Sequence, residues 1–383
     1  MRAHAKLSPS AASRWLECTA APAAEAGFKE EYSEYAAEGT FAHELAELET
    51  KIALGMISDA DYSVQFKMKS TNEFYSREML DHVQEYSTYI KEKVASLEGS
   101  DPVVELEVRL DLQTWVPEGF GTADCIIVAE GHLWVIDFKY GKGVAVEAEG
   151  NPQMKLYALG AYAKYLPLYD IEKIHTVIIQ PRLGGVSEAE ISHIALTAWG
   201  THKVKPRAKK AYEGNGEYKP GESTCRFCKA AGSCKARADY FIDLFDEAEG
   251  KGLMTAEETA EYLRRAAGLK DWVESMKETV FNALMAGEEI AGWKLVEGKS
   301  NRKYSDENEV YRRLKAKRFR TQDLYEKKLL GIGKMEKLVG KKKLQEICGD
   351  LIVKPKGSPT LAPADDKRPE WKPEDGVLEA FDE

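Results

Sequence analysis

Two apolar runs, residues 125–128 and 133–136, flank Glu130 and Gly131 in the middle of the chain. Each run is apolar on both alternations of an extended chain, which is typical of central strands covered on both faces. A two-residue turn at Glu130 and Gly131 would join them into an antiparallel hairpin. The pattern therefore predicts a hairpin at the centre of a sheet.

Asp124, Asp137 and Lys139 converge in this hairpin. Its register places Asp124 directly opposite Asp137, and Lys139 projects to the same face because alternate residues of a strand share a side. Opposed carboxylates with Cβ atoms about 5 Å apart repel, so a hard divalent cation, Mg²⁺ or Mn²⁺, would neutralise them. The alternative is a solvated charge pair on an edge strand. The apolar runs favour a functional site, because ionisable groups at the ends of buried strands cluster at sites.

Helical patterns lie on both sides of the hairpin. Asn151 is expected to cap a helix over residues 152–165 that has Pro at its first position. Gln153 and Tyr157 share one face of that helix. Upstream, the residues around His43 also read as helical. A lone helical histidine is more often structural than a ligand, so His43 by itself is a weak candidate.

The remaining patterns indicate an α/β protein of several segments. Further strands are expected at residues 103–112 and 175–181, and amphipathic helices at 41–52 and 73–97. Glu107, in the first strand, could add a carboxylate to the site, but an exposed acid on a strand is ordinary. The predicted segments are a helical N-terminal region contributing Cys18 and His43 (1–98), a β-rich core (99–200), a cysteine segment (201–245), a helical segment that opens with a capping box at Thr255 and Glu258 (246–290), a basic C-terminal module (291–356) and an extended acidic tail (357–383).

Four motifs occur in a familiar order. They are His43, Gly121-x-x-Asp124, Asp137-x-Lys139 and Gln153-x-x-x-Tyr157. Together they resemble the RecB-like branch of the PD-(D/E)XK nuclease superfamily. The resemblance implies a restriction-endonuclease-like mixed central sheet flanked by helices, and a Mg²⁺- or Mn²⁺-dependent deoxyribonuclease, most simply an exonuclease.

The same resemblance implies a role for each residue. His43, Asp124 and Asp137, with the Phe138 carbonyl, would bind the metal. Lys139 would position or activate the attacking water. Gln153 and Tyr157 would support the site or the DNA. The middle acid, Asp137, is aspartate, the less bulky of the two acids that the family permits at this place. The shorter side chain alters the reach of the carboxylate but not its chemistry.

The chemistry of phosphodiester hydrolysis is compatible with these residues. The reaction needs a hydroxide near neutral pH and shielding of the phosphate, which divalent ions supply, and Lys139 adds a mobile charge beside them. One alternative is a DNA-binding or scaffold protein with a vestigial site, against which the intact Asp124, Asp137 and Lys139 argue. A zinc peptidase is set aside because His43-Glu44 lacks the second histidine of H-E-x-x-H.

The six cysteines are too few for a disulfide scaffold, and no apolar leader or long apolar run indicates secretion or a membrane span. We therefore expect a cytoplasmic, reduced protein. Three thiolates cluster and need a fourth, for which Cys18 is the best candidate because Cys125 lies in the hairpin and Cys348 in an expected helix. The cluster is Cys225-x2-Cys228-x5-Cys234. The spacing is compatible with structural zinc and with a [4Fe–4S] cluster.

A resemblance separates these two cofactors. One cysteine ahead of the core and three behind it is similar to the iron–sulfur staple of AddB-type and CRISPR-adaptation nucleases. That resemblance favours a structural [4Fe–4S] cluster over Zn²⁺. Such a staple would close a loop of about 200 residues, whose ordering entropy is otherwise unfavourable.

Charge is distributed unevenly along the chain. The net charge is −10, yet residues 291–356 hold about twice as many basic as acidic side chains. This asymmetry predicts either a nucleic-acid contact surface or a solvated helix face. The whole pattern also resembles an uncharacterised nuclease-like family of phage and prophage replication regions. The expected partners are DNA and phage replication or single-strand-binding proteins, with no membrane.

Overall fold

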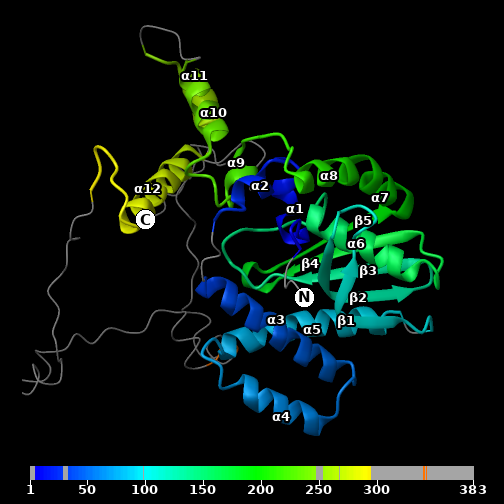
Figure 1. Ribbon diagram of the computed structural model, residues 1–383. Coiled ribbons are helices and arrows are strands. Elements are labelled where there is room, and N and C mark those ends of the chain that lie inside the picture. The colour runs from blue at the N-terminus through cyan, green and yellow to red at the C-terminus, as the bar shows by residue number, and fades with distance from the viewer. Residues whose placement is uncertain are drawn as a thin grey trace, which may run out of the picture. The chain divides into compact units, whose positions relative to one another are not determined.

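The computed structural model describes residues 5–28, 33–97, 99–246, 253–266 and 268–294, together with Gly340 and Lys342. The chain forms two units, one of residues 1–254 and 265–294 and the other of residues 255–264 and 295–383. Most of the predicted basic module and all of the tail, with Cys348, lie outside the described residues. The first unit carries the sheet and both candidate sites (Figure 1).

A five-stranded sheet in the order β1-β2-β3-β4-β5 forms the centre of the first unit. Its strands are β1 (Val103–Asp111), β2 (Phe120–Ala129), β3 (His132–Phe138), β4 (Lys173–Gln180) and β5 (Gly185–Ser192). β3 and β4 are parallel, and the other neighbours are antiparallel. The predicted α/β class with a mixed central sheet is confirmed. Strand β5 was not predicted, because its alternate residues are largely polar and exposed.

The hairpin of β2 and β3 has the predicted register. Glu130 and Gly131 have φ values of 35° and 78°, as a tight primed turn between strands requires. The pairing runs from Ala129 opposite His132 to Cys125 opposite Ile136. Continued by one residue, it brings the positions of Asp124 and Asp137 opposite each other.

Helices cover both faces of the sheet (Figure 1). Ile126 and Val128 of β2 pack in one core with α6 (Pro152–Tyr165). Cys125 and Ile127, one position away along the same strand, pack in a second core with α3 (Glu34–Ala53) and α5 (Arg77–Ala95). This alternation explains why the strand is apolar at every position: both of its faces are buried.

The other elements connect or flank this centre. They are η1 (Pro9–Ala11), α1 (Ala12–Trp15), α2 (Ala21–Glu25), α4 (Asp59–Lys69), η2 (Pro181–Leu183), α7 (His193–Trp199), the π-helix η3 (Gly200–Val204), α8 (Lys205–Glu213), α9 (Glu222–Cys225), α10 (Lys235–Asp246) and α12 (Leu269–Met285). In the second unit, α11 (Ala256–Arg265) begins with the predicted capping box. Glu258 N–H donates to Thr255 Oγ1 at 3.2 Å, and Thr255 N–H donates to Glu258 Oε2 at 2.8 Å.

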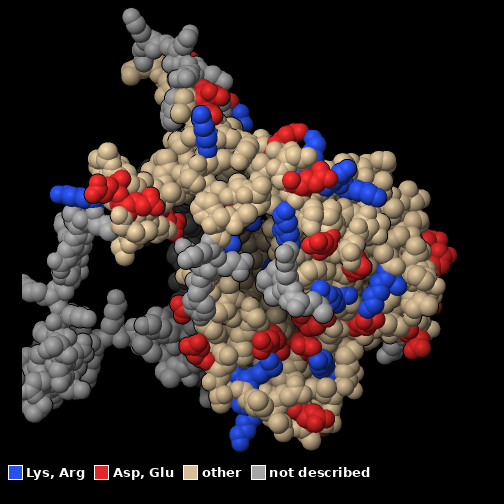
Figure 2. All heavy atoms as spheres, viewed as in Figure 1, with Lys and Arg blue, Asp and Glu red and all other residues tan. Residues whose placement is uncertain are grey.

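The surface is consistent with the composition of the chain. Basic and acidic side chains intermingle over the face of the molecule seen in Figure 2. No helix in the described ranges is both long and apolar enough to cross a lipid bilayer.

Candidate active site and cysteine pocket

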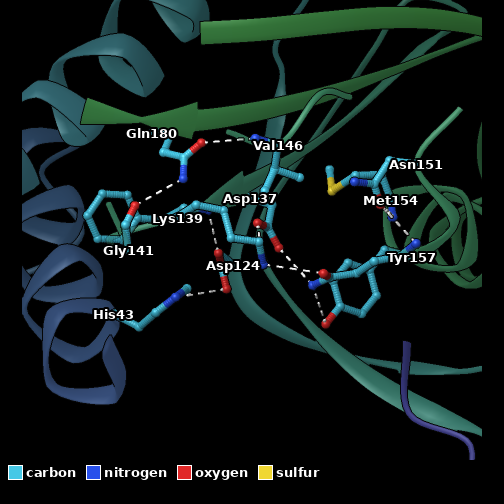
Figure 3. A network of polar contacts seen from close by, with 12 residues as sticks. His43, Asp124, Asp137, Lys139, Gly141, Val146, Asn151, Met154, Tyr157 and Gln180 are labelled. Atoms are coloured by element: carbon cyan, nitrogen blue, oxygen red, sulfur yellow. Dashed lines mark hydrogen bonds and ion pairs between the residues drawn. The ribbon is translucent and has the colours of Figure 1, made fainter. Parts of the chain in front are cut away.

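The predicted site residues come from α3, β2, the end of β3 and the start of α6, and the structure brings them together (Figure 3). Asn151 caps α6 as predicted: its Oδ1 accepts hydrogen bonds from the N–H groups of Gln153 and Met154. This cap starts α6 beside the end of β3, so that Gln153 in its first turn reaches the charged residues. We call His43, Glu107, Asp124, Asp137 and Lys139 the acidic site.

Asp137 is the buried centre of this arrangement, with 2% of its surface exposed. Its Oδ1 accepts a hydrogen bond from Gln153 Nε2 at 3.1 Å. Lys139 Nζ lies 2.9 Å from Oδ2 as an ion pair, without the angles of a hydrogen bond. Lys139 also donates to Gln153 Oε1 at 3.3 Å, and Gln153 Nε2 lies 3.3 Å from Tyr157 Oη. One amide therefore orients both members of the ion pair.

Asp124 is held by the backbone and by a histidine. Its Oδ2 accepts a hydrogen bond from Phe138 N–H at 2.7 Å, and its Oδ1 lies 3.2 Å from His43 Nδ1. The His43 ring packs edge-on against Phe138 with centroids 5.5 Å apart. Asp124 therefore has a single orientation, with one oxygen toward β3 and the other toward α3.

Gly121 and Gln180 support the site, and their contacts explain how. A Cβ on Gly121 would lie 2.7 Å from Tyr157 Cε1 and 2.8 Å from Pro9 Cγ, so glycine is needed for the tyrosine ring to pass. Gln180, at the end of β4, is buried and was not predicted. Its side chain bonds the backbone of Gly141, Val144 and Val146, which pins the loop that follows Lys139. In the sequence, Gln180 is marked only as a polar residue at the end of an apolar strand.

Burial and neighbouring charges compete in the electrostatics of the site. Burial raises the pKa of Asp137 against the opposing charge of Lys139, and the nearby Asp124 charge raises it further. Burial lowers the pKa of Lys139, but the adjoining Asp137 carboxylate outweighs this effect and the net shift is upward. Burial likewise lowers the pKa of His43, and the charge of Asp124 reverses the shift. The carboxylates, the ammonium and the imidazole are mutually dependent.

Glu107, which the sequence offers as a possible further carboxylate, is exposed as expected and also lies at the site. Ligand atoms of His43, Glu107 and Asp124 all lie within 4.8 Å of one another. The β1–β2 register runs from Leu106 opposite Cys125 to Val108 opposite Ala123, so Glu107 occupies the position opposite Asp124. Partial desolvation, aided by Asp124, raises the pKa of Glu107 to about 7.

The donor set is compatible with a divalent cation. Carboxylate oxygens suit Mg²⁺ and Mn²⁺, and imidazole is an additional ligand for a transition metal. Asp137 Oδ2 is buried and faces the Lys139 ammonium at 2.9 Å. Phe138, whose carbonyl is the remaining predicted ligand, follows Asp137 in the chain and contacts Asp124 through its N–H. Of the predicted metal ligands, His43 and Asp124 are therefore grouped with Glu107, whereas Asp137 is not among these three.

Comparison with known proteins places the chain in a family. A family model described as "Protein of unknown function (DUF2800)" matches residues 4–369. The chain belongs to this family. Among solved structures, it is similar to one titled "Crystal structure of SSO0001", with 17% sequence identity and a TM-score of 0.24 over 50% of this chain and 85% of that chain.

A second candidate site of this DUF2800 chain is the cysteine pocket, lined by Cys18, Cys225, Cys228 and Cys234. Cys18 lies between α1 and α2, Cys225 ends α9, and the other two lie in the turn before α10. All four thiols are free. The rest of the lining is largely alanine, from α2 and from the cysteine segment. The structure thus brings together the four cysteines that the sequence grouped.

Backbone contacts hold the pocket together across the chain. The N–H groups of Lys219 and Gly221 lie 3.5 Å from the sulfurs of Cys18 and Cys225. Arg207 of α8 donates to the carbonyls of Leu16 and Glu17, just ahead of Cys18. The N-terminal segment is therefore tied to the region that follows the sheet.

Burial makes two of the thiols poor acids. It raises the pKa of Cys228 to about 12 and that of Cys225 above its usual range. A thiol in an apolar pocket stays protonated, whereas a coordinating metal removes its proton outright. These two thiols are thus unreactive without a metal and suited to one that binds sulfur.

Proposed function

We propose that this protein is a metal-dependent DNA nuclease, and that it acts as an exonuclease in phage-type DNA replication or recombination. The observation that carries the proposal is the buried Asp137 carboxylate, which pairs with Lys139 at 2.9 Å. A second acid, Asp124, contacts His43. Buried charges are costly unless they are paired, and perturbed ionisable groups of this kind cluster at functional sites. Carboxylates that can hold a divalent ion, with a lysine beside them, suit phosphodiester hydrolysis.

Each residue has a defined part in this proposal. Asp124, Asp137 and His43 would hold Mg²⁺ or Mn²⁺, with the Phe138 carbonyl as a further ligand. When bound, the ion supplies an ionised water near neutral pH and shields charge on the phosphate. Lys139, which Gln153 orients, places a positive charge beside the scissile phosphate as negative charge develops there.

Gln153 and Tyr157 act through their neighbours. The Gln153 amide donates to Asp137 and accepts from Lys139, so it fixes the distance between the acid and the ammonium. Tyr157 holds Gln153 from the next turn of α6. We therefore assign both as positioning residues, whose loss would misplace Lys139 without removing a charge.

The cysteine pocket would hold a structural [4Fe–4S] cluster. The resemblance to iron–sulfur nucleases favours this cluster over zinc, and the four cysteines around one pocket supply the ligands that either would need. The N–H groups of Lys219 and Gly221, 3.5 Å from two of the sulfurs, could donate to cluster-bound thiolates.

The test is digestion of end-labelled single-stranded, duplex and circular DNA with Mg²⁺ or Mn²⁺. An exonuclease degrades the linear substrates and spares the closed circle. Asp137→Asn, which keeps the shape of the side chain, should remove the activity. Asp170→Asn, an exposed acid beside the turn of the hairpin, should keep it.

Two outcomes would contradict the proposal. Full cleavage by Asp137→Asn would place the chemistry elsewhere. Tight DNA binding with no cleavage by the wild-type protein in either metal would favour the scaffold alternative.

A further inference from the structure

Three acids form a row straight across the sheet. Asp137 of β3 lies one residue beyond the pair of Cys125 and Ile136, which places it opposite Asp124 of β2. Glu107 of β1 occupies the position opposite Asp124 on the other side. Strand β1 is irregular at Glu107, which has a φ of 50° and lies between Leu106 of one core and Val108 of the other. Asp124 is the middle acid of the three, and His43 of α3 lies 3.2 Å from it (Figure 3).

The outer acid of this row is uncompensated. Within the described part of the chain, the Glu107 side chain takes part in no hydrogen bond or ion pair, whereas Asp137 pairs with Lys139. A pocket lined by His43, Glu107 and Asp124 is also lined by Glu47. Glu47 is paired with Lys51 at 2.6 Å. Two facing carboxylates beside a single histidine concentrate negative charge, which a cation would offset.

We propose that Glu107 is a direct ligand of a divalent cation that it binds together with His43 and Asp124. The ligand atoms of these three residues lie within 4.8 Å of one another, a separation that one ion can bridge. The inference rests on the proposed function for the identity of the site, and it adds a ligand on the β1 side of Asp124 that the nuclease motifs do not contain.

The surroundings of the trio show on which side of Asp124 the cation would lie. His43, Glu107 and Asp124 line one pocket, together with Ala46 and Thr50 of α3. Asp137, on the other side of Asp124, is already paired with Lys139 at 2.9 Å. A cation bound by Glu107 would therefore lie on the α3 side of Asp124.

The test measures Mn²⁺ binding to the full-length protein by calorimetry, with no DNA present. Glu107→Gln keeps the shape of the side chain and removes its charge, and it should weaken Mn²⁺ binding by at least about tenfold. Glu47→Gln is the matched control, because Glu47 lines the same pocket but lies outside the trio. Its affinity should stay within about twofold of wild type, since it provides no ligand.

A second readout separates ligation from a structural role. In chelator, Glu107→Gln should unfold at a temperature no lower than wild type, because it removes an acid that faces Asp124. The increase in unfolding temperature that Mn²⁺ produces should shrink, since stabilisation follows affinity. A residue needed only for folding would lower the first temperature instead.

The outcomes distinguish this inference from the proposed function. Equal Mn²⁺ affinity of Glu107→Gln and wild type, or no Mn²⁺ binding by wild type, overturns the assignment of Glu107. Weakened Mn²⁺ binding in a protein that cleaves no DNA upholds the ligand and overturns the nuclease.

Discussion

The acidic site and the cysteine pocket are assembled by different structural elements. Both gather residues that are far apart in the sequence, from His43 to Lys139 in one and from Cys18 to Cys234 in the other. In the acidic site, strand register and a helix cap position the side chains. In the cysteine pocket, short helices and turns do so. Strand register fixes the positions of the charged side chains, whereas the short turns need a bound group to hold the cysteines in place.

The surroundings of the two sites differ accordingly. The acidic site is a network of charges and hydrogen bonds around a buried carboxylate. The cysteine pocket is lined largely by alanine, and burial raises the pKa of two of its thiols, Cys225 and Cys228. We expect the first site to keep its shape without metal and the second to lose stability, so changes in one should leave the other nearly intact.

The largest expected effect is on activity. Asp137→Ala should lower DNA cleavage by at least about 10³-fold, and Lys139→Ala by roughly 10²- to 10³-fold with Mn²⁺ still bound, because the charge on the phosphate is no longer balanced. Iron content should be unchanged in both variants. Rates on labelled duplex DNA and iron analysis check this pair of results. A loss of iron in Asp137→Ala would show that the two sites are not independent.

Removing one thiol should lower the iron content and stability and leave the acidic site nearly unchanged. Cys18→Ser should lower the iron content from about four per chain and lower stability by roughly 3–5 kcal/mol, by analogy with the loss of a long covalent loop closure. Mn²⁺ affinity at the acidic site should change little. Denaturation under anaerobic conditions and calorimetry measure the two effects. Zinc in place of iron in the purified protein would contradict the proposed cluster.

A change at Gly121 tests whether register alone maintains the acidic site. The added methyl group of Gly121→Ala meets the Tyr157 ring at 2.7 Å, so Tyr157 and Gln153 must shift. Overpacking of this kind costs about 1–3 kcal/mol. The expected result is a lower unfolding temperature with a reduced cleavage rate and nearly normal Mn²⁺ affinity. Wild-type stability and rate would mean that the ring moves freely.

The smallest expected effect is a dependence of stability on pH. The pKa of Glu107 is raised from 4.5 to about 7, so the folded state binds more protons than the unfolded state between these values. The stability of metal-free protein should therefore fall as pH rises through this window. Glu107→Gln should show a flatter profile of unfolding temperature against pH. An identical profile would assign the dependence to other groups.

The hairpin and the acidic site show which positions can be predicted from the sequence. The two-residue turn at Glu130 and Gly131 determines the β2–β3 register, so Asp124, Asp137 and Lys139 could be grouped from the sequence. The connection from β1 to β2, residues 112–119, is too long to determine a register by itself. For that reason the sequence could name Glu107 only as a possible further carboxylate and could not place it opposite Asp124.

The sequence by itself determined the elements whose signals are local: the buried strands, the turn between them, the Asn151 cap and the spacing of the cysteines. Tertiary structure alone decided which distant elements meet. Packing of α3 against the sheet brought His43 to Asp124, and packing of α8 against the N-terminal segment brought Cys18 to the other cysteines. The physical reason is that turns and caps act over a few residues, whereas the burial that joins distant helices is non-directional and leaves no mark at a single position.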